Sequence, residues 1–554
     1  MKKISLFDGT AITLEEILDA RSARAERQRA FLAEGGMSLI SFALNMPGPV
    51  KQSVTARRVF EEGIREIRKD IESLSGTVPG AEKAASEKAA SEISGKTAEK
   101  FTAETAKKTA AETSEKKAAE KAASETSGKM ATEKGRVILR EDVSHEMTGS
   151  QAFFLLNLPA DRIKKKMTEI EEYHPLGRLF DIDVIGPDGV PLSRTQFGLP
   201  ARTCMVCGEN AKICARSGAH SAEIIAYTLN DLVHSYFRDK EADRVAICAT
   251  RALLYEVSTT PKPGLVDRAN QGSHSDMDYF TFVDSSATLC HWFRDMFCVG
   301  WDHADDSPES LFRRLQFIGK MADRAMFRAT GGVNTHQGLI YAVTIIAAAI
   351  GKMMRTGSAE EIPEKHLIEE CRKIGRCSLR EKFGCSGISP ETGEEKDKNK
   401  APEPLRAAES ESSLINSGRE AAKGNETPAY GARGEAAEGF PHALNIGLPA
   451  IRKWLAQGCS LNDASCAALL SIIAETEDTN MIRRGGNEEA QRRREEAREI
   501  LRNMTAETIV PDISKLDSDY IRHHLSPGGS ADILAISLLF CFCEEEGILT
   551  GDHA

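Results

Sequence analysis

Two aspartates, Asp181 and Asp183, stand two residues apart in HPLGRLFDIDV (174–184), a segment with the apolar pattern of a strand. Alternate residues of a strand share one face, so both carboxylates can bind the same Mg²⁺, as phosphoryl or nucleotidyl transfer requires. The Gly177–Arg178 pair suits a turn at which an arginine contacts phosphate. We therefore expect Asp181, Asp183 and Arg178 to be catalytic. The alternative is a solvated strand face, because Asp-x-Asp alone is common.

A second group, Cys204, Cys207, Cys214 and His220, offers three thiols and an imidazole within a short stretch. This is the ligand set of a tetrahedral zinc ion, and the first pair has the spacing of a zinc knuckle. The alternative is a set of reduced thiols in a segment where Arg216 and His220 contact phosphate. The sequence leaves both interpretations open.

Polar, glycine-rich segments in the second half of the chain offer a third site. Loops of this kind can fold their backbone amides around phosphates. We expect nucleotide contacts from Lys262, Asp267, Asn270, Asn334, His336, Arg483 and Arg484. Asp276, Asp278, Glu475 and Asp478 are candidate Mg²⁺ ligands, and His274 is a candidate general acid or loop hydrogen-bonder. The alternative is helix capping, with Ser275 as N-cap and Asp278 in the first turn.

The elements that carry these residues differ between the two halves of the chain. A helical stripe spans 11–34, Ser53 can cap a following helix, and strand-like runs cover 38–44, 153–158 and 179–185. Beyond residue 239 the spacing is nearly all helical: 241–257, 277–297, 311–328, 338–354, 446–456 and 463–482. The pattern predicts an N-terminal α/β domain with a mixed sheet over 1–238 and an all-α domain over 239–554.

Two low-complexity insertions interrupt these domains. Residues 76–135 are almost wholly Ala, Glu, Lys, Ser and Thr, with EKAASE repeated, and residues 386–427 are rich in Pro, Glu, Lys, Ser and Asn. Without a stripe of large apolar residues neither segment can dock on a core. We expect no chemistry from either.

Composition narrows the class of protein. A net charge of −11 and a pI near 5.8 argue against binding to nucleic acids or anionic membranes. The 13 cysteines are scattered and odd in number, which favours reduced thiols. The N-terminus lacks a signal-peptide core, and the apolar run 339–350 is shorter than the roughly 20 residues of a membrane span. These features predict a cytoplasmic protein.

The first half resembles a known family. NMPGPVK (45–51), HPLGRLFDIDV and the stretch from Arg202 to His220 are similar to the apo-citrate-lyase phosphoribosyl-dephospho-CoA transferases over about residues 10–235. The resemblance implies a nucleotidyltransferase-like fold in which an acyl carrier serine attacks the phosphate nearest the ribose and pyrophosphate leaves. Asp181 and Asp183 would hold Mg²⁺, and Arg178 and Lys51 would neutralise the triphosphate. Lys51 could equally be a surface lysine after a turn.

The second half resembles the triphosphoribosyl-dephospho-CoA synthases. The similar segments are PKPGLVDRANQGSHSDMD (261–278), TGGVNTHQG (330–338), GARGEAAEGFP (431–441), EDTN (477–480) with RRGG, and SPGGSAD (526–532). The resemblance implies that the ribose of ATP is joined to a hydroxyl of dephospho-CoA with loss of adenine. Carboxylates suit this reaction because the anomeric carbon acquires oxocarbenium character. His523-His524-Leu525 departs from the Asn-Ile pair expected before SPGGSAD.

Together the two resemblances predict a bifunctional enzyme that builds and attaches the prosthetic group of citrate lyase. Its partners would be ATP, 3'-dephospho-CoA and the acyl carrier subunit of the lyase, and its ions Mg²⁺ and a structural Zn²⁺. Two rival hypotheses are a non-catalytic zinc-stabilised scaffold and a nucleotidyltransferase that acts on nucleic acid. The acidic composition weighs against the second rival.

Overall fold

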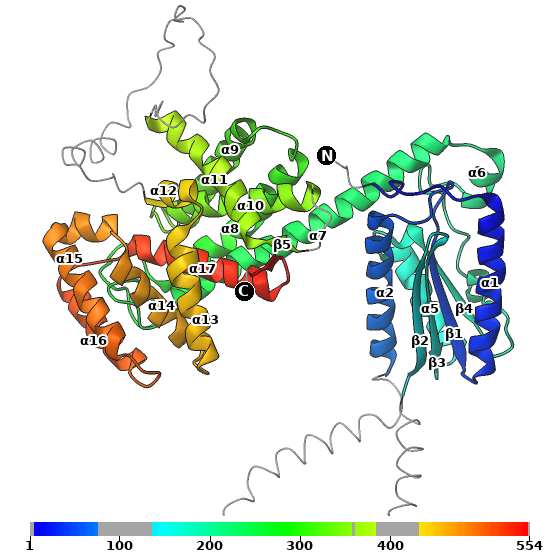
Figure 1. The fold of residues 1–554 in the computed structure, drawn as a ribbon, viewed down its shortest axis with the longest axis horizontal. Helices are drawn as coiled ribbons and strands as arrows, with labels where there is room; N and C mark the ends of the chain where they lie inside the picture. The colour runs from blue at the N-terminus through cyan, green and yellow to red at the C-terminus, as the bar shows by residue number, and fades with distance from the viewer. Residues whose placement is uncertain (1–4, 76–135, 357–360, 384–430, 552–554) are drawn as a thin grey trace, which may run out of the picture. The chain divides into compact units, whose positions relative to one another are not determined.

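The computed structural model describes residues 5–75, 136–356, 361–383 and 431–551, and both predicted insertions lie outside these ranges. The chain divides into two compact units, Lys3–Phe237 and Arg238–Ala554 (Figure 1). The helix α7 (Ala222–Ser258) runs across the division, so the helix expected over 241–257 is the second half of a longer continuous helix.

The N-terminal unit is built around a four-stranded sheet with strand order β2-β3-β1-β4. Its strands are β1 (Ser38–Leu44), β2 (Ile138–Glu146), β3 (Gly149–Leu156) and β4 (Phe180–Ile185). Its helices are α1 (Leu14–Ala33), α2 (Val54–Ser75), α5 (Ala160–Tyr173) and α6 (Ala211–Ser217), with 3-10 turns η1 (Gly177–Leu179) and η2 (Arg194–Phe197).

Every neighbouring pair in this sheet is antiparallel, so the expected mixed sheet is wrong. The helix α5 does connect β3 to β4, which run in the same direction. However, β1 lies between these two strands and runs the opposite way, so no parallel pair forms. The strand β2 pairs with β3 as a hairpin and forms the other edge of the sheet.

Helices cover both faces of the sheet (Figure 1). On one face Phe31 of α1 packs with Leu39 and Phe153 in a buried cluster. On the other face Phe42 of β1 stacks on Phe60 of α2, with ring centroids 4.8 Å apart. Because the strand alternates, Ser41 and its β4 neighbour Asp183 share the face covered by α1. The predicted carboxylate pair therefore lies beneath that helix.

The second unit is helical, apart from one two-residue parallel pair, β5 (Ile362–Pro363) and β6 (Leu549–Thr550), within the residues that the structure describes. After α7 its helices are α8 (Tyr279–Asp302), α9 (Pro308–Ala329), α10 (Gln337–Thr356), α11 (Glu364–Phe383), α12 (Gly431–Glu438), the π-helical η4 (Ala443–Gly447), α13 (Leu448–Ala456), α14 (Leu461–Glu475), α15 (Thr479–Asn503), α16 (Ile509–Arg522) and α17 (Gly528–Glu545).

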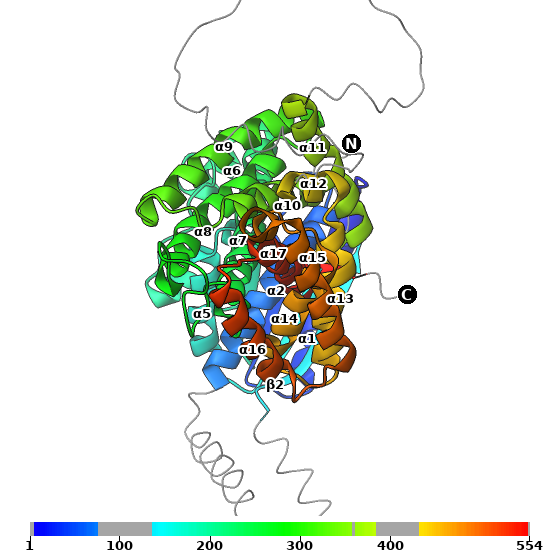
Figure 2. The same ribbon diagram turned by 90° about the vertical axis from the view of Figure 1, so that its left-hand side faces the viewer.

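Two apolar helices, α10 and α17, form the centre of this unit. The helix α17 is buried almost without interruption from Ile533 to Cys543, and it lies among α10, α13, α14 and α15 (Figure 2). In the described residues α10 is the one helix long and apolar enough to cross a membrane, yet 72% of its apolar window is buried inside the protein. It is therefore packed as a core helix.

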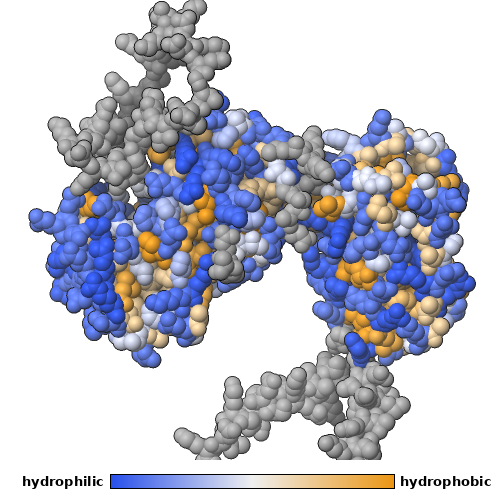
Figure 3. Space-filling model, in the orientation of Figure 1, coloured by the Kyte–Doolittle hydropathy of each residue, from blue (hydrophilic) through white to orange (hydrophobic). Residues whose placement is uncertain are grey.

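The outer helices are amphipathic or strongly polar. The surface over α15 is hydrophilic (Figure 3), in keeping with the Arg- and Glu-rich sequence of that helix. A kink divides α15 at Gly486, whose φ of +80° is accessible to glycine without strain. The kink separates a short first segment, which carries Arg483 and Arg484, from the long solvent-facing remainder.

Candidate active sites

The loop between α7 and α8 is shaped by one buried aspartate, Asp267. Its carboxylate accepts hydrogen bonds from the amides of Lys262 (3.1 Å), Ala269 (2.7 Å) and Asn270 (3.0 Å). These bonds satisfy backbone donors inside the loop and fix its path. Asp267 therefore places Lys262 by organising the backbone around it.

The same loop is tied to α16. Asp517 accepts hydrogen bonds from the Gly264 amide and the Asn270 side chain, both at 2.9 Å. Gly264 has a φ of +67°, and a Cβ there would lie 2.2 Å from the Leu525 carbonyl oxygen. Only glycine fits this close approach of two backbones. Asn270 is thus a structural contact that joins the loop to α16.

The loop forms part of the wall of a cavity of about 490 Å³. Segments far apart in the sequence contribute polar side chains to its lining: Glu256, Lys262, His274, Asp276, Asn334, His336, Asn480, Arg483, Arg484, Ser526 and Asp532. The sequence predicted a role for seven of these residues: Lys262, His274, Asp276, Asn334, His336, Arg483 and Arg484. The folded chain therefore gathers several of the predicted polar segments in one place.

Three helices begin at this cavity. Gln337 and Gly338 at the start of α10 line it, as does Gly528 at the start of α17. Asn480 contributes the first turn of α15. The N-terminal turn of a helix carries unpaired amides and a partial positive charge, and both favour anions. Together with the Lys262, Arg483 and Arg484 cations they suit a polyphosphate.

A buried ion pair lies in the wall. The Lys262 ammonium donates a hydrogen bond to the Glu256 carboxylate, and the two residues are only 1% and 3% exposed. Burial raises the pKa of Glu256, whereas the lysine opposes this shift. Each charge needs the other at this depth.

His336 is held in one orientation by hydroxyl groups. The Thr335 hydroxyl donates to Ser285 at 2.8 Å, which leaves the Ser285 hydroxyl to donate to His336 Nδ1 at 2.7 Å. Burial, together with the Lys262 charge, lowers the pKa of His336 to about 3, so the ring is neutral near pH 7. The other ring nitrogen, Nε2, is buried and has no partner among the described residues. A hydrogen bond with a ligand would satisfy it.

Asp532 supplies a second carboxylate to the cavity. Burial raises its pKa well above the ordinary value, and the nearby Glu256 and Asp478 carboxylates add to the shift. A Cβ on Gly338 would lie 2.4 Å from Asp532 Oδ2, so the glycine lets this carboxyl group approach the start of α10. A positive charge beside Asp532 would stabilise the ionised form of its carboxyl group.

His274, Asp276 and Arg484 form the outer rim. His274 Nε2 lies 2.9 Å from the Ser526 hydroxyl, and its Nδ1 lies 3.8 Å from Asp276. Burial and the Arg484 charge lower the pKa of His274. Arg484 donates to the carbonyl groups of Ser273 (3.0 Å) and His524 (3.1 Å), so it links three polar segments. Here the His523-His524-Leu525 segment contributes a backbone group.

Asn334 lies at the start of α10. Its side-chain oxygen accepts from the Gln337 amide at 3.2 Å, which caps the helix while Asn334 also lines the cavity.

Three predicted carboxylates lie in other structural settings and are not among the cavity-lining residues. Asp278 is the N-cap of α8 and accepts the Thr281 amide at 2.9 Å. Asp478 is the N-cap of α15 and also accepts the amide and hydroxyl groups of Ser530. Glu475 pairs with Arg498 at the surface. The capping alternative had placed Ser275 at the N-cap of α8, but Asp278 takes that position.

In the N-terminal unit, Asp181 and Asp183 point to the face of β4 that α1 covers. Arg24 of α1 reaches both carboxylates, with nitrogen–oxygen distances of 4.0 and 3.7 Å, and donates to Ser41 Oγ at 3.0 Å. The carboxylates are half-exposed, each with 46% of its side chain accessible. Burial and the Asp181 charge raise the pKa of Asp183. The pair therefore favours cations.

The predicted phosphate contacts of this unit lie in two places. Arg178 is close to Arg194 and Arg202, and burial followed by the Arg202 charge lowers its pKa. Lys51 donates to the Met46 carbonyl, and burial followed by the Arg21 charge lowers its pKa. Among the described residues neither Arg178 nor Lys51 forms a hydrogen bond or ion pair with the two aspartates. Each has another cation nearby, as anion-binding groups often do.

The three cysteines and the histidine of the predicted zinc site lie close together. The ligand atoms of Cys204, Cys207, Cys214 and His220 all lie within 4.8 Å of one another. Cys207 Sγ is 3.5 Å from Cys214 Sγ and 3.3 Å from His220 Nε2. Burial raises the pKa of Cys204, but the Val206 and Cys207 amides outweigh it and bring it to about 7. These donors match a tetrahedral zinc site in number and type.

Sequence reasoning missed Glu256, Asp532 and Arg24. Glu256 interrupts the apolar run Leu253-Leu254-Tyr255-Glu256-Val257, and a charge in such a run is a usable signal. Asp532 stands immediately before the apolar stretch of α17, in the quoted SPGGSAD segment. Arg24 is one of many charges on α1, so its spacing gave no indication.

The two units carry two transferase domains. A family model described as ATP:dephospho-CoA triphosphoribosyl transferase matches residues 242–549. A model described as apo-citrate lyase phosphoribosyl-dephospho-CoA transferase matches residues 12–115 and 101–236. The chain is thus a bifunctional transferase of citrate lyase maturation. It belongs to the ATP:dephospho-CoA triphosphoribosyl transferase family, fused to a domain of the second family.

Curated relatives share this arrangement. The chain is 29% identical to protein CitXG of Haemophilus influenzae, over 96% of this chain and 97% of that protein. It is 26% identical to protein CitXG of Leuconostoc mesenteroides over the same shares. The 2-(5''-triphosphoribosyl)-3'-dephosphocoenzyme-A synthase of Klebsiella pneumoniae is 33% identical and aligns with 53% of this chain and 89% of its own length.

Proposed function

We propose that the helical unit forms 2'-(5''-triphosphoribosyl)-3'-dephospho-CoA from ATP and 3'-dephospho-CoA and releases adenine. The N-terminal unit then transfers phosphoribosyl-dephospho-CoA to a serine of the citrate lyase acyl carrier (gamma) subunit and releases pyrophosphate. The observation that carries the first half is the convergence of three helix N-termini, three cations and two carboxylates, Glu256 and Asp532, on one cavity.

In the first reaction the triphosphate of ATP occupies the cationic side of the cavity. Lys262, Arg483 and Arg484 neutralise its oxygens, and the amides at the start of α10 and α17 donate to it. Asp276, on the rim with 62% of its side chain exposed, is the predicted carboxylate best placed to share a Mg²⁺ with the phosphates. Asp278 and Asp478 already accept amide hydrogen bonds as caps.

The reacting carbon then faces the carboxylates. The bond between C1 of the ATP ribose and N9 of adenine breaks, and the acceptor hydroxyl oxygen bonds to the same carbon. Positive charge develops there, and Asp532 and Glu256 stabilise it. The acceptor hydroxyl group loses one proton and the departing adenine gains one, so the reaction releases no net proton. His274 protonates the leaving base or holds the loop, and His336 Nε2 forms a hydrogen bond with the substrate.

In the second reaction the carboxylate pair of β4 acts on the triphosphate end of the intermediate. Asp181 and Asp183 fit a Mg²⁺ because both face one side of the strand and are accessible. The ion would supply positive charge to the phosphates during attack. Arg24 orients the two carboxylates from α1, whereas Arg178 and Lys51 bind phosphate oxygens at other points of the site.

The zinc assignment is a separate proposal. Cys204, Cys207, Cys214 and His220 would hold one Zn²⁺ that cross-links the segment before α7. Reduced thiols at these positions, and substrates such as ATP and dephospho-CoA, support the proposal of a cytoplasmic enzyme. We propose no nucleic-acid or membrane partner.

The test uses the whole chain with two separate readouts. Wild-type protein with ATP, Mg²⁺ and dephospho-CoA should release adenine, measured by chromatography, and should then add the group to the acyl carrier subunit, measured by mass spectrometry. Asp532→Asn should lower adenine release about a hundredfold. Asp183→Asn should abolish attachment while adenine release continues.

These two variants are matched controls for each other, since each is altered in one unit only. Preformed triphosphoribosyl-dephospho-CoA should restore attachment in Asp532→Asn but not in Asp183→Asn. Full attachment by Asp183→Asn, or no adenine from the wild type, would refute the corresponding half of the proposal.

A further inference from the structure

A second cavity, of about 710 Å³, adjoins the first within the helical unit. It is lined by α9, α10, α11 and α12, and it shares Gln337 and Gly338 with the cavity described above. The two cavities therefore meet at the first turn of α10. This volume is within the range of pockets that hold small organic ligands.

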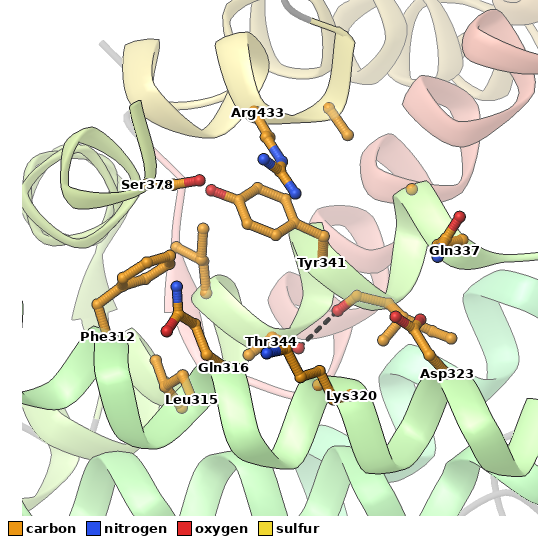
Figure 4. A pocket seen from close by; sticks show the side chains of 15 residues that line it. Phe312, Leu315, Gln316, Lys320, Asp323, Gln337, Tyr341, Thr344, Ser378 and Arg433 are labelled. Atoms are coloured by element: carbon orange, nitrogen blue, oxygen red, sulfur yellow. Dashed lines mark hydrogen bonds between the residues drawn. The ribbon is translucent and has the colours of Figure 1, made fainter. Parts of the chain in front are cut away.

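The lining of this cavity combines apolar and polar side chains (Figure 4). Phe312, Leu315, Ile340 and Ile345 supply the apolar wall. Gln316, Lys320 and Asp323 recur at helical spacing along α9, so they present one polar face. Arg433 lies over the Tyr341 ring, 5.6 Å from its centroid.

Two buried polar atoms in this cavity lack a hydrogen-bond partner of good geometry among the described residues. They are Asp323 Oδ1 and the Tyr341 hydroxyl oxygen, although Gln337 and Ser378 lie beside them. Burial raises the pKa of both groups. A buried polar atom without a hydrogen-bond partner destabilises the folded protein. A ligand with hydrogen-bond donors and acceptors in the cavity would supply the missing partners.

We propose that this second cavity binds the adenosine diphosphate part and the adjoining apolar arm of dephospho-CoA, and that it presents the acceptor hydroxyl at the shared wall. The inference rests on the proposed synthase function. Aromatic rings and the Asp323 carboxylate suit a purine with an exocyclic amine, whereas Lys320 and Arg433 suit a diphosphate.

Charge separates the two nucleotides between the two cavities. The first cavity combines three cations with three helix N-termini and has little apolar lining, which matches a triphosphate. The second has two cations and a broad apolar wall, which matches a diphosphate joined to a long amide arm. Their junction at Gln337 and Gly338 lies next to Asp532, where the C1 to oxygen bond would form.

Gly319 offers a way to block the second cavity alone. It lines the cavity from α9, and a Cβ there would meet only Thr344 Oγ1, at 3.8 Å. A leucine would therefore extend into the cavity without a backbone clash. Phe317→Leu provides the matched control, because Phe317 lies on the same helix, is 66% exposed and does not line the cavity.

The experiment measures adenine release by the full chain while each substrate is varied in turn. Gly319→Leu should raise the KM for dephospho-CoA at least about tenfold and leave the KM for ATP within about twofold. Phe317→Leu should change neither. A rise in the KM for ATP alone would assign the cavity to ATP, and unchanged KM values in a folded Gly319→Leu protein would overturn the proposal.

Two further measurements test the proposal if Gly319→Leu does not fold or if the wild type is inactive. If Gly319→Leu fails to fold, the double variant Lys320→Gln/Arg433→Gln is judged by the same two KM values. If the wild type releases no adenine, the synthase function fails, and calorimetric titration with dephospho-CoA alone decides on the cavity. Binding by the wild type that Gly319→Leu weakens supports the site, whereas equal binding or none refutes it.

Discussion

The Lys262 ammonium donates a hydrogen bond to the Glu256 carboxylate in the wall of the first cavity, where neither side chain has more than a few per cent of its surface exposed. The two residues come from the end of α7 and from the loop that follows it. The pair therefore fixes the loop against the helix and places a cation beside the proposed triphosphate.

Breaking this pair should destabilise the helical unit strongly. Glu256→Gln or Lys262→Met leaves one buried charge without compensation, which costs about 3–5 kcal/mol of unfolding free energy. The double variant should cost less than the sum of the two, because no charge remains unpaired. Urea unfolding of the three proteins measures this coupling.

A surface pair gives the comparison. Arg251 and Glu545 pair at 3.2 Å with 32% and 49% of their side chains exposed. Glu545→Gln should therefore cost less than about 1 kcal/mol. Equal effects at Glu256 and Glu545 would contradict the role given to burial.

The stability of the helical unit should depend on pH through Asp532. The pKa of Asp532 is raised in the folded state, so the protonated carboxyl group does not destabilise the fold at low pH. As the pH rises above 3.8 the group ionises more easily in the unfolded chain, and the free energy of unfolding decreases until the raised pKa is passed. Asp532→Asn cannot ionise. The melting temperature of this variant should therefore exceed that of the wild type by a margin that grows as the pH rises above 3.8. A margin that does not change with pH would contradict the raised pKa of Asp532.

Local patterns in the sequence predicted several elements well. The run 38–44 is β1, and Ser53 does accept the Ala56 amide at 2.9 Å as the predicted cap of α2. Both follow from hydrogen bonding and alternation within a few residues. By contrast β2, with the sequence ILREDVSHE, is an edge strand whose many charges hide its periodicity.

Features set by distant contacts could not be predicted. The helix expected over 463–482 is broken at 476–478, because Asp478 caps α15 and also binds Ser530, 52 residues further on. Strand order is another example, since β1 separates β3 from β4. The sites show the same division: residue types identified the polar loops, but only the folded chain brings Glu256 and Asp532 to the cavity.

Asp278 and Asp478 provide a test of capping against catalysis. Asp278→Asn keeps a side-chain oxygen at the N-cap of α8 and should change the stability little, because Asn caps helices about as well as Asp. Asp478 is buried and holds the starts of two helices, so Asp478→Asn should cost more, about 2–3 kcal/mol. Adenine release per folded molecule should stay close to the wild-type rate in Asp278→Asn. A large loss of turnover with unchanged melting would instead make Asp278 a catalytic or metal-binding group.

The last prediction concerns the cysteine group of the N-terminal unit. Four ligand atoms within 4.8 Å of one another form a closed donor set, and such a set binds Zn²⁺ tightly enough to stabilise the surrounding fold. Protein purified under reducing conditions with added zinc should contain about one Zn²⁺ per chain. Cys204→Ser and Cys214→Ser should lose the metal, whereas Cys459→Ser, at a half-buried cysteine outside the group, should keep it.

Stability should follow the metal content. Because a ligand that binds only the folded state stabilises it by mass action, a strong chelator should lower the melting temperature of the wild type and leave Cys204→Ser unchanged. Attachment to the acyl carrier subunit should decline along with stability, while adenine release persists. Metal analysis that finds no zinc, together with a melting temperature insensitive to chelator, would show that Cys204, Cys207 and Cys214 are reduced thiols, the alternative that the sequence left open.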